Sequence, residues 1–243
     1  MNKSELAALF ARHKKVALYF GGGKDSLACL YLLRPHWDRL HVYWCNPGNP
    51  FPETIEQMQR IRKLVPLFKE VRGNQPEIIA QDGWPSDVVP ERYTTDGNIA
   101  FGPTPFKVQH RLYCCYRAFW MPMFETLLAD GMTCLIRSRR HGETDKTEYG
   151  SGTITPQGQE IVFPIFNWTA DDVYRYLQAE GVELPPFYRY SDHSIDCMDC
   201  TGYWGEGHGK YLAAQHPKAF IDYHRRITLI KRAVAEQMDI CGE

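Results

Sequence analysis

Along the first 65 positions, short continuous apolar runs alternate with segments in which apolar residues are spaced as in a helix. Short apolar runs at 15–20 and 40–44 have the length of buried strands, whereas 4–13, 26–33 and 53–64 carry apolar residues at helical spacing. Each strand-like run ends in a loop rich in glycine or proline that leads into the next helix. Strand, loop and helix in this repeated order predict a parallel sheet with crossover helices.

The pattern fades in the middle of the chain and returns towards its end. Residues 73–110 are rich in Gly, Pro, Asp and Asn without a clear period, which predicts a long surface excursion, and 139–160 is predicted as a polar loop. The remaining expected elements are a helix over 111–129, strands at 133–138 and 161–165, a helix to Gln178 with Thr169 as its N-cap, and a last helix over 210–238 broken near Pro217.

No internal repeat or linker divides the chain. We therefore predict one domain over 1–243, a Rossmann-like α/β fold with a parallel sheet, flanking helices and a C-terminal helical segment. The formal net charge of −1 gives no global attraction to nucleic acid or to a membrane surface. No apolar run has the length of a membrane span and no signal-peptide core is present, so we expect a cytoplasmic protein without membrane contact.

A glycine-rich loop follows the first predicted strand and precedes a predicted helix. Glycines let the backbone approach an anion closely, and the N–H groups at a helix start bind phosphate oxygens. The loop is not a Walker loop, because Asp25 follows the lysine, and it lacks the third glycine of a dinucleotide fingerprint. We predict that it holds the phosphates of a nucleotide through Gly21, Gly22, Gly23, Lys24, Asp25 and Ser26.

Five blocks of the sequence resemble the PP-loop superfamily of adenine nucleotide α-hydrolases, and within it the phosphoadenosine phosphosulfate (PAPS) and adenosine phosphosulfate (APS) reductases. The glycine loop is similar to the motif Ser-Gly-Gly-x-Asp-Ser, with Gly21 in place of the first serine, which removes one hydroxyl donor. The other four blocks follow in the same order as in that family: Asn46 to Thr54, Ile136 to Arg140, Pro164 to Val173 and Ser194 to Thr201. The resemblance implies that the bound nucleotide is an adenine nucleotide, namely APS, PAPS or ATP.

Eight cysteines fall into distinct contexts. Cys29, Cys45 and Cys134 lie in apolar stretches and are expected in the core. Two pairs, Cys114-Cys115 and Cys197-x-x-Cys200, supply four thiolates, enough for a tetrahedral zinc ion or a cubane iron–sulfur cluster, and spacing alone does not separate the two. The same arrangement in APS reductases implies a [4Fe–4S] cluster on these four cysteines.

Basic residues follow the strand predicted at 133–138. Ligands of open parallel sheets bind at the carboxyl ends of the strands, and the arginine fork matches phosphate or sulfate oxygens in two-point contact. With the family resemblance, Arg139 and Arg140 are therefore candidate anion ligands.

Two reactions are compatible with the resemblance. In a reductase, a cysteine attacks the sulfur of APS or PAPS and a thioredoxin-like reductant releases sulfite. Cys241, in a terminal Cys-Gly, is the candidate nucleophile, although the Glu-Cys-Gly-Leu-His tail of those reductases is otherwise missing. This reaction is our first choice.

In an ATP pyrophosphatase, Lys24 would bind the pyrophosphate, Asp25 would hold Mg²⁺ or orient the lysine, and the acceptor could be a nucleic acid, as in the thiolation of tRNA or DNA. Lys24 favours this second reaction, whereas the cysteine pattern favours reduction. A non-catalytic nucleotide-binding accessory protein is the third alternative.

Overall fold

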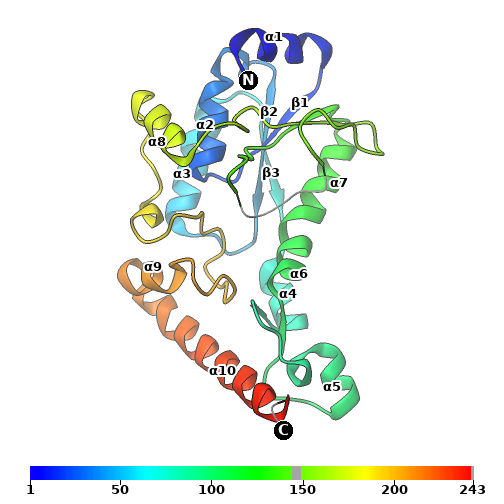
Figure 1. Cartoon of the computed structure of the whole chain (residues 1–243), viewed down its shortest axis with the longest axis vertical. Coiled ribbons are helices and arrows are strands. Elements are labelled where there is room, and N and C mark those ends of the chain that lie inside the picture. The colour runs from blue at the N-terminus through cyan, green and yellow to red at the C-terminus, as the bar shows by residue number, and fades with distance from the viewer. Residues whose placement is uncertain (144–148, 242–243) are drawn as a thin grey trace. The chain divides into compact units, whose positions relative to one another are not determined.

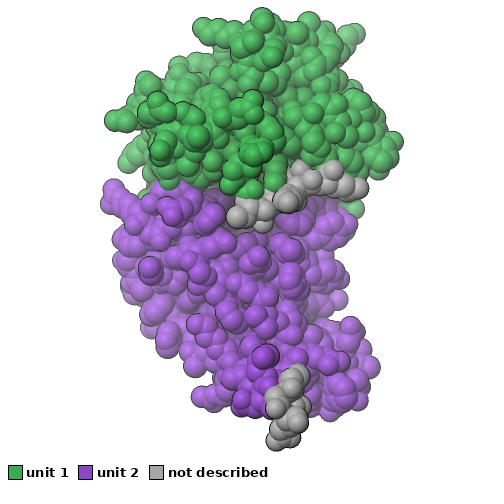
Figure 2. Space-filling view, in the orientation of Figure 1, with its two compact units in different colours: residues 1–45, 52–71, 123–186 green, residues 46–51, 72–122, 187–243 purple. Residues whose placement is uncertain are grey.

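The computed structural model describes residues 1–143 and 149–241, the last two of these as backbone only. Within that range the chain divides into two compact units, coloured separately in Figure 2. Unit 1 comprises residues 1–45, 52–71 and 123–186, and unit 2 comprises 46–51, 72–122 and 187–243. The expectation of a single domain stays a prediction.

Unit 1 is built around a five-stranded sheet with the order β3-β2-β1-β6-β7. β1 pairs in parallel with β2 on one side and with β6 on the other, and β6 pairs in parallel with β7. The α/β class, the parallel sheet and the flanking helices of the sequence prediction are confirmed. The strands are β1 (Val16–Tyr19), β2 (Leu40–Asn46), β3 (Phe68–Arg72), β6 (Cys134–Ile136) and β7 (Glu160–Val162).

The helices of this unit lie close to the predicted positions, except that α7 starts ten residues later than the helix predicted over 111–129. They are α1 (Lys3–Arg12), α2 (Lys24–Leu32), α3 (Pro52–Leu64), α7 (Met121–Ala129) and α8 (Ala170–Ala179). Thr169 caps α8 in a reciprocal capping box with Asp172, which confirms the predicted start of that helix.

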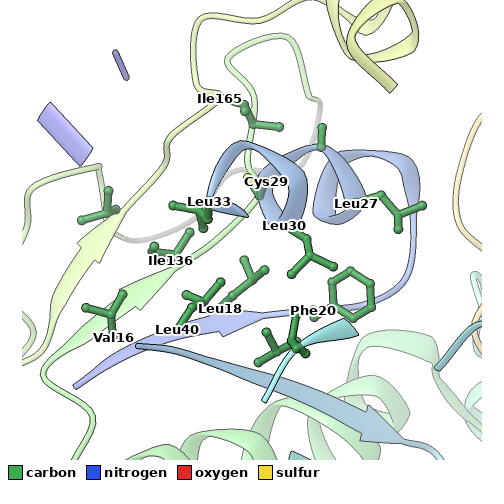
Figure 3. Close-up of a cluster of buried hydrophobic side chains, with 14 of the residues drawn as sticks. Val16, Leu18, Phe20, Leu27, Cys29, Leu30, Leu33, Leu40, Ile136 and Ile165 are labelled. Atoms are coloured by element: carbon green, nitrogen blue, oxygen red, sulfur yellow. The ribbon is translucent and has the colours of Figure 1, made fainter. Parts of the chain in front are cut away.

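One buried cluster joins α1, α2, α3 and α8 to the central strands. α2 carries Leu27, Cys29 and Leu30 on the face that meets Val16 and Leu18 of β1, together with residues of β2 and β6 (Figure 3). These side chains are almost completely buried, so the cluster fixes α2 firmly against the sheet. Cys29 and Cys134 lie in it as expected, and Cys45 is buried as well.

Unit 2 contains elements that the sequence pattern did not predict. The stretch 73–110 is not a structureless excursion, because it forms short helices and two parallel strands, β4 and β5. Elements of three to eight residues are too short to display a hydrophobic period, which explains the error. They are α4 (Gln75–Asp82), β4 (Trp84–Ser86), α5 (Thr95–Phe101) and β5 (Val108–His110), with a 3₁₀ turn at Glu91–Tyr93.

The predicted helix over 111–129 is not uniform. It starts as α6 (Arg111–Cys115), widens into a π-helical turn at Tyr116–Trp120 and continues as α7. The final helical segment is confirmed, with α9 (His208–Gln215) and α10 (Pro217–Cys241) separated at His216 (Figure 1). Proline opens the first turn of α10, where its missing N–H costs nothing. Two further 3₁₀ turns lie at Arg34–His36 and Pro186–Arg189.

Candidate functional site

The glycine loop lies where the strand order reverses. From β1 the chain adds β2 and β3 on one side of the sheet, and later adds β6 and β7 on the other side of β1. The carboxyl ends of β1 and β6 are therefore neighbours at the switch point of the sheet. The loop follows β1, and Arg139 and Arg140 follow β6. Ligands of open α/β sheets bind at this position, so the fold brings the two predicted anion-binding segments to one edge.

The backbone of the loop depends on one glycine above all. Gly22 has φ +82°, and a Cβ there would lie 2.6 Å from the Met58 methyl and 2.7 Å from the Gln57 amide oxygen. Gln57 in turn donates its Nε2 to the Gly22 carbonyl at 3.1 Å. Gly21 differs, since a Cβ at that position would meet no atom within 4 Å.

The first turn of α2 has no side-chain cap. Its N-cap is Gly23, which has no side chain to accept hydrogen bonds from the N–H groups of that turn. Ser26 instead donates its hydroxyl to the Gly23 carbonyl at 2.9 Å. Backbone donors and the positive end of the helix dipole therefore face the same edge of the sheet.

A compact set of charges surrounds this turn. Lys24 Nζ lies 3.0 Å from Asp25 Oδ2, and Arg140 Nε lies 2.6 Å from Asp25 Oδ1. Arg140 also approaches Glu143, with 3.7 Å between Nη2 and Oε1. Burial, with the Asp25 charge adding to it, raises the pKa of Glu143. Arg139 has no ion-pair partner among the residues that the structure describes, so the two adjacent arginines have different surroundings.

The four paired cysteines come together in unit 2. Cys114 and Cys115 end α6, and Cys197 and Cys200 lie in the loop before α9, where Cys197 forms an isolated bridge with Pro50. All four are free thiols, and Cys114 and Cys197 are only 2% and 6% exposed. Burial raises the pKa of the Cys197 thiol, and the charges of the other three cysteines raise it further. Mutual interaction of this kind requires the four side chains to be near one another.

Three of these sulfurs have a hydrogen-bonding group beside them. Gln75, which is 2% exposed, donates to Cys114, and the N–H of Gly202 donates to Cys200. The hydroxyl of Tyr203 lies 3.6 Å from the sulfur of Cys115. Donors of this kind stabilise sulfur in its thiolate form, the form that binds metal.

Cations lie beside the same cysteines. Arg117 favours the thiolate of Cys114, and Arg111 favours that of Cys115. Each arginine is held by a carboxylate, Asp82 for Arg117 and Asp87 for Arg111. Two positive charges next to four thiols suit an anionic metal–thiolate centre.

The donor set fits an iron–sulfur cluster better than a single zinc ion. Four thiols with sulfur-directed donors match the ligands of a cubane cluster. A single tetrahedral zinc needs its sulfurs about 2.3 Å from one point. Within residues 1–143 and 149–241, no three His, Cys, Asp or Glu side chains are arranged to hold one metal ion. Cys114, Cys115, Cys197 and Cys200 are the residues that would hold a cluster if one is bound.

Three residues near the predicted sites could not be recognised from the sequence, and the predicted role of Cys241 stays untested. Gln57, Gln75 and Glu143 carry no motif, and only their contacts reveal them. Cys241 ends α10, and its side chain is outside the described residues, so its role as a nucleophile stays a prediction. No helix in the described part of the chain has the length and apolar character needed to cross a membrane.

The fold and the edge that carries the glycine loop define an α/β protein of the PAPS reductase type. The crystal structure of a PAPS reductase from Candida auris, in a phosphate complex, superposes with a TM-score of 0.57 at 10% identity, covering 81% of this chain and 88% of that one. At that identity the likeness concerns the fold alone.

Sequence comparison finds a matching domain and distant relatives. Residues 107–203 match the family model for the phosphoadenosine phosphosulfate reductase domain. This range includes all four paired cysteines and the adjacent Arg139 and Arg140. An adenosine 5'-phosphosulfate reductase of Bacillus cereus (strain Q1) is 23% identical over 84% of this chain and 81% of its own length. A sulfate adenylyltransferase subunit 2 of Mycolicibacterium vanbaalenii is 24% identical over 76% of this chain and 60% of its own length. Over residues 107–203 the chain matches the PAPS reductase domain, and over most of its length it is a distant homologue of APS reductases.

Proposed function

We propose that the protein is a sulfonucleotide reductase that binds APS or PAPS at the glycine loop and carries a [4Fe–4S] cluster on Cys114, Cys115, Cys197 and Cys200. The observation that carries this proposal is the grouping of four free thiols, two of them buried, three of which have a hydrogen-bonding group beside them. Structural cysteines without a ligand have no need of such donors. Relatives in the same family are APS reductases, which agrees with this assignment.

Unit 1 supplies the groups that would hold the nucleotide. The N–H groups at the start of α2 and the charge of Lys24 bind phosphate oxygens, while Gly22 keeps the loop backbone close to them. Arg139 provides a two-point contact to a phosphate or sulfate oxygen pair. Arg140 keeps Asp25 paired, so that the Asp25 carboxylate does not repel the incoming anion.

The chemical step would use the thiolate of Cys241. Its sulfur attacks the sulfur of the nucleotide's sulfate group, a sulfur–sulfur bond forms, and the bond from that sulfur to the phosphate-bridging oxygen breaks, so that the nucleoside phosphate leaves with the electron pair. One thiolate of a thioredoxin-like dithiol then attacks the cysteine sulfur, which releases sulfite and forms a mixed disulfide. The second thiol of the dithiol displaces the enzyme thiolate, so that the dithiol ends as its own disulfide and Cys241 is regenerated. When bound, the cluster would supply charge and would link the chain segments that carry the four cysteines. It would not bind substrate at iron, because cysteines fill all four iron positions.

A second candidate function is favoured by Lys24. A lysine in the loop suits the β,γ-pyrophosphate of ATP, and a sulfate adenylyltransferase subunit is among the relatives. In this alternative the protein cleaves ATP to AMP and pyrophosphate with Mg²⁺, and the adenylylated acceptor, which could be a tRNA or DNA, takes up sulfur or nitrogen. Asp25 would then hold the Mg²⁺ ion.

The test is carried out with anaerobically reconstituted protein. Iron and sulfide are counted per chain, and sulfite release is measured with APS and with PAPS in the presence of reduced thioredoxin, for the parent protein and Cys241→Ser. We expect four irons per chain, sulfite from the parent and none from the variant. A Lys24→Ala variant, expected to lose nucleotide affinity, serves as the control for loss of binding.

Other outcomes assign the chain differently. Pyrophosphate from ATP without sulfite from either sulfonucleotide identifies the ATP pyrophosphatase. Nucleotide binding without any turnover identifies a non-catalytic accessory protein. A chain that retains zinc in place of iron overturns the cluster assignment.

A further inference from the structure

Tyr203 has an unusual backbone conformation beside the paired cysteines. Its φ is +58°, and no other non-glycine residue in the described part of the chain has a positive φ. Left-handed backbone is rare for a residue with a bulky side chain, and such residues persist only where their surroundings hold them. Tyr203 follows Cys200 by three positions, so its conformation decides where the chain goes after the second cysteine pair.

Asp87 and Arg111 supply the surroundings that hold Tyr203. The two oxygens of Asp87 accept the N–H of Tyr203 at 2.7 Å and the N–H of Trp204 at 2.8 Å. Arg111 donates to Asp87 at 2.9 Å and places its guanidinium 4.3 Å from the centre of the Tyr203 ring. The phenol ring is therefore fixed from its backbone and from one face.

This arrangement directs the hydroxyl of Tyr203 to Cys115. The oxygen lies 3.6 Å from Sγ, within the range of a hydrogen bond to sulfur. A tyrosine hydroxyl can donate and accept, whereas a cysteine that ligates iron is a thiolate and can only accept. With a cluster bound, Tyr203 is consequently the donor.

We propose that Tyr203 is a positioning residue for the cluster, which stabilises the thiolate of Cys115 through a hydrogen bond and thereby slows the loss of iron. The inference rests on the proposed cluster. Hydrogen bonds from neighbouring groups to metal ligands are known to control metal affinity, and removal of one costs about tenfold or more. The donated proton also withdraws electron density from the iron–sulfur bond to Cys115.

The test compares Tyr203→Phe with Tyr113→Phe. The first variant keeps the ring, its stacking on Arg111 and the backbone, and removes only the hydroxyl. Tyr113 lies on the same helix as Cys115 but is 52% exposed, and its hydroxyl has no hydrogen-bond partner in the part of the chain that is described, so its variant is a matched control.

All proteins are reconstituted anaerobically with ferrous iron and sulfide. Iron per chain, the rate at which excess chelator bleaches the visible absorbance, and the Fe–S(Cys) stretching frequencies in the resonance Raman spectrum are measured. We expect the Tyr203→Phe protein to bleach about tenfold faster and to show an upward shift of one Fe–S(Cys) band. The Tyr113→Phe protein should match the parent in both.

Equal bleaching rates and equal spectra for parent and Tyr203→Phe would overturn this inference while leaving the cluster assignment in place. A parent protein without iron would overturn the cluster and the inference together. If Tyr203→Phe does not fold, Arg111→Lys is the second variant, because it loses the stacked guanidinium and retains a charge beside Asp87. The Arg111→Lys protein should bleach faster than the parent, by less than the tenfold expected for complete loss of the hydrogen bond. A bleaching rate equal to that of the parent would overturn the inference.

Discussion

Arg140 donates from Nε to Oδ1 of Asp25 across 2.6 Å, and this ion pair connects the segment after β6 to the first turn of α2. Both side chains are largely buried, with Lys24 on the other oxygen of the same carboxylate. Arg140 is therefore engaged within the loop, while Arg139, one position earlier, has no ion-pair partner in the described residues. Of two arginines that look equivalent in the sequence, the structure gives Arg140 an internal ion pair, and Arg139 has none among the described residues.

We expect Arg140→Ala to lower the stability of the protein and Arg139→Ala to weaken nucleotide binding. Removing Arg140 leaves a largely buried carboxylate with one partner fewer, so the free energy of unfolding should fall by about 2 kcal/mol. Removing Arg139 should leave stability within about 0.5 kcal/mol of the parent and weaken APS or ATP binding at least tenfold. Urea unfolding and calorimetric titration with each nucleotide measure the two effects.

The assignment of the two arginines would be wrong if Arg139→Ala bound both nucleotides as well as the parent. It would also be wrong if Arg140→Ala unfolded at the same urea concentration as the parent. Arg137 lies in the same segment and is exposed, so Arg137→Ala controls for a general loss of positive charge at this edge.

Gly22 and Gly21 offer a matched pair in the glycine loop. Gly22→Ala places a Cβ 2.6 Å from Met58 and imposes φ +82° on an alanine, so we expect about 1–3 kcal/mol of destabilisation and loss of nucleotide binding. Gly21→Ala meets no atom within 4 Å and should be tolerated. Thermal unfolding and nucleotide titration of both variants provide the comparison.

The same space at Gly21 permits a gain of function. Gly21→Ser introduces the hydroxyl of the Ser-Gly-Gly-x-Asp-Ser motif, and the open surroundings leave room for it. We expect tighter nucleotide binding by about tenfold or more, the contribution of one hydrogen bond to a charged group. Weaker binding of Gly21→Ser than of Gly21→Ala would show that this position does not face the phosphates.

His208 should make the stability of the chain depend on pH. Burial lowers the pKa of His208 to about 4, against a value near 6.5 in an unfolded chain. Between these two values the unfolded state binds more protons, so the contribution is complete above about pH 6.5 and is lost as the pH falls towards about 4. Urea unfolding at a series of pH values from neutrality downwards should show this decline.

His208→Gln tests the origin of that decline, because glutamine can still donate to the Met198 carbonyl that pairs with the histidine. The slope of stability against pH should become shallower in the variant, whatever its stability at neutral pH. His41→Gln is the control in unit 1, since burial and Lys15 lower the pKa of His41 in the same sense. An unchanged slope in His208→Gln would assign the decline to other groups.

Local patterns in the sequence were sufficient for the outline of unit 1. The apolar runs, the glycine loop and the N-cap at Thr169 each act within a few residues, so β1, β2, β6, β7, α2 and α8 start close to where the pattern predicts, whereas β3 was not predicted. The break at Pro217 is of the same kind, because the proline ring interrupts a helix by its own chemistry. The four cysteines were also recognisable from their spacing and from the family resemblance.

Contacts between distant positions could not be derived in that way. Gln75 and Cys114 are 39 positions apart in the sequence. No local hydrophobic pattern indicates that the Gln75 amide forms a hydrogen bond with the Cys114 sulfur. The short strands β4 and β5 are stabilised by pairing with each other, and three residues are too few to show a pattern.

The sequence by itself determined the class of fold, and it supplied the glycine loop and the four cysteines on which the proposed anion site and the proposed metal–thiolate centre rest, because each depends on spacing along the chain. Only the tertiary structure decided that Arg140 pairs with Asp25, that Tyr203 reaches Cys115 and that Gly22, not Gly21, requires glycine. Those outcomes depend on which side chains meet after the chain has folded, and packing brings together atoms that the sequence keeps far apart.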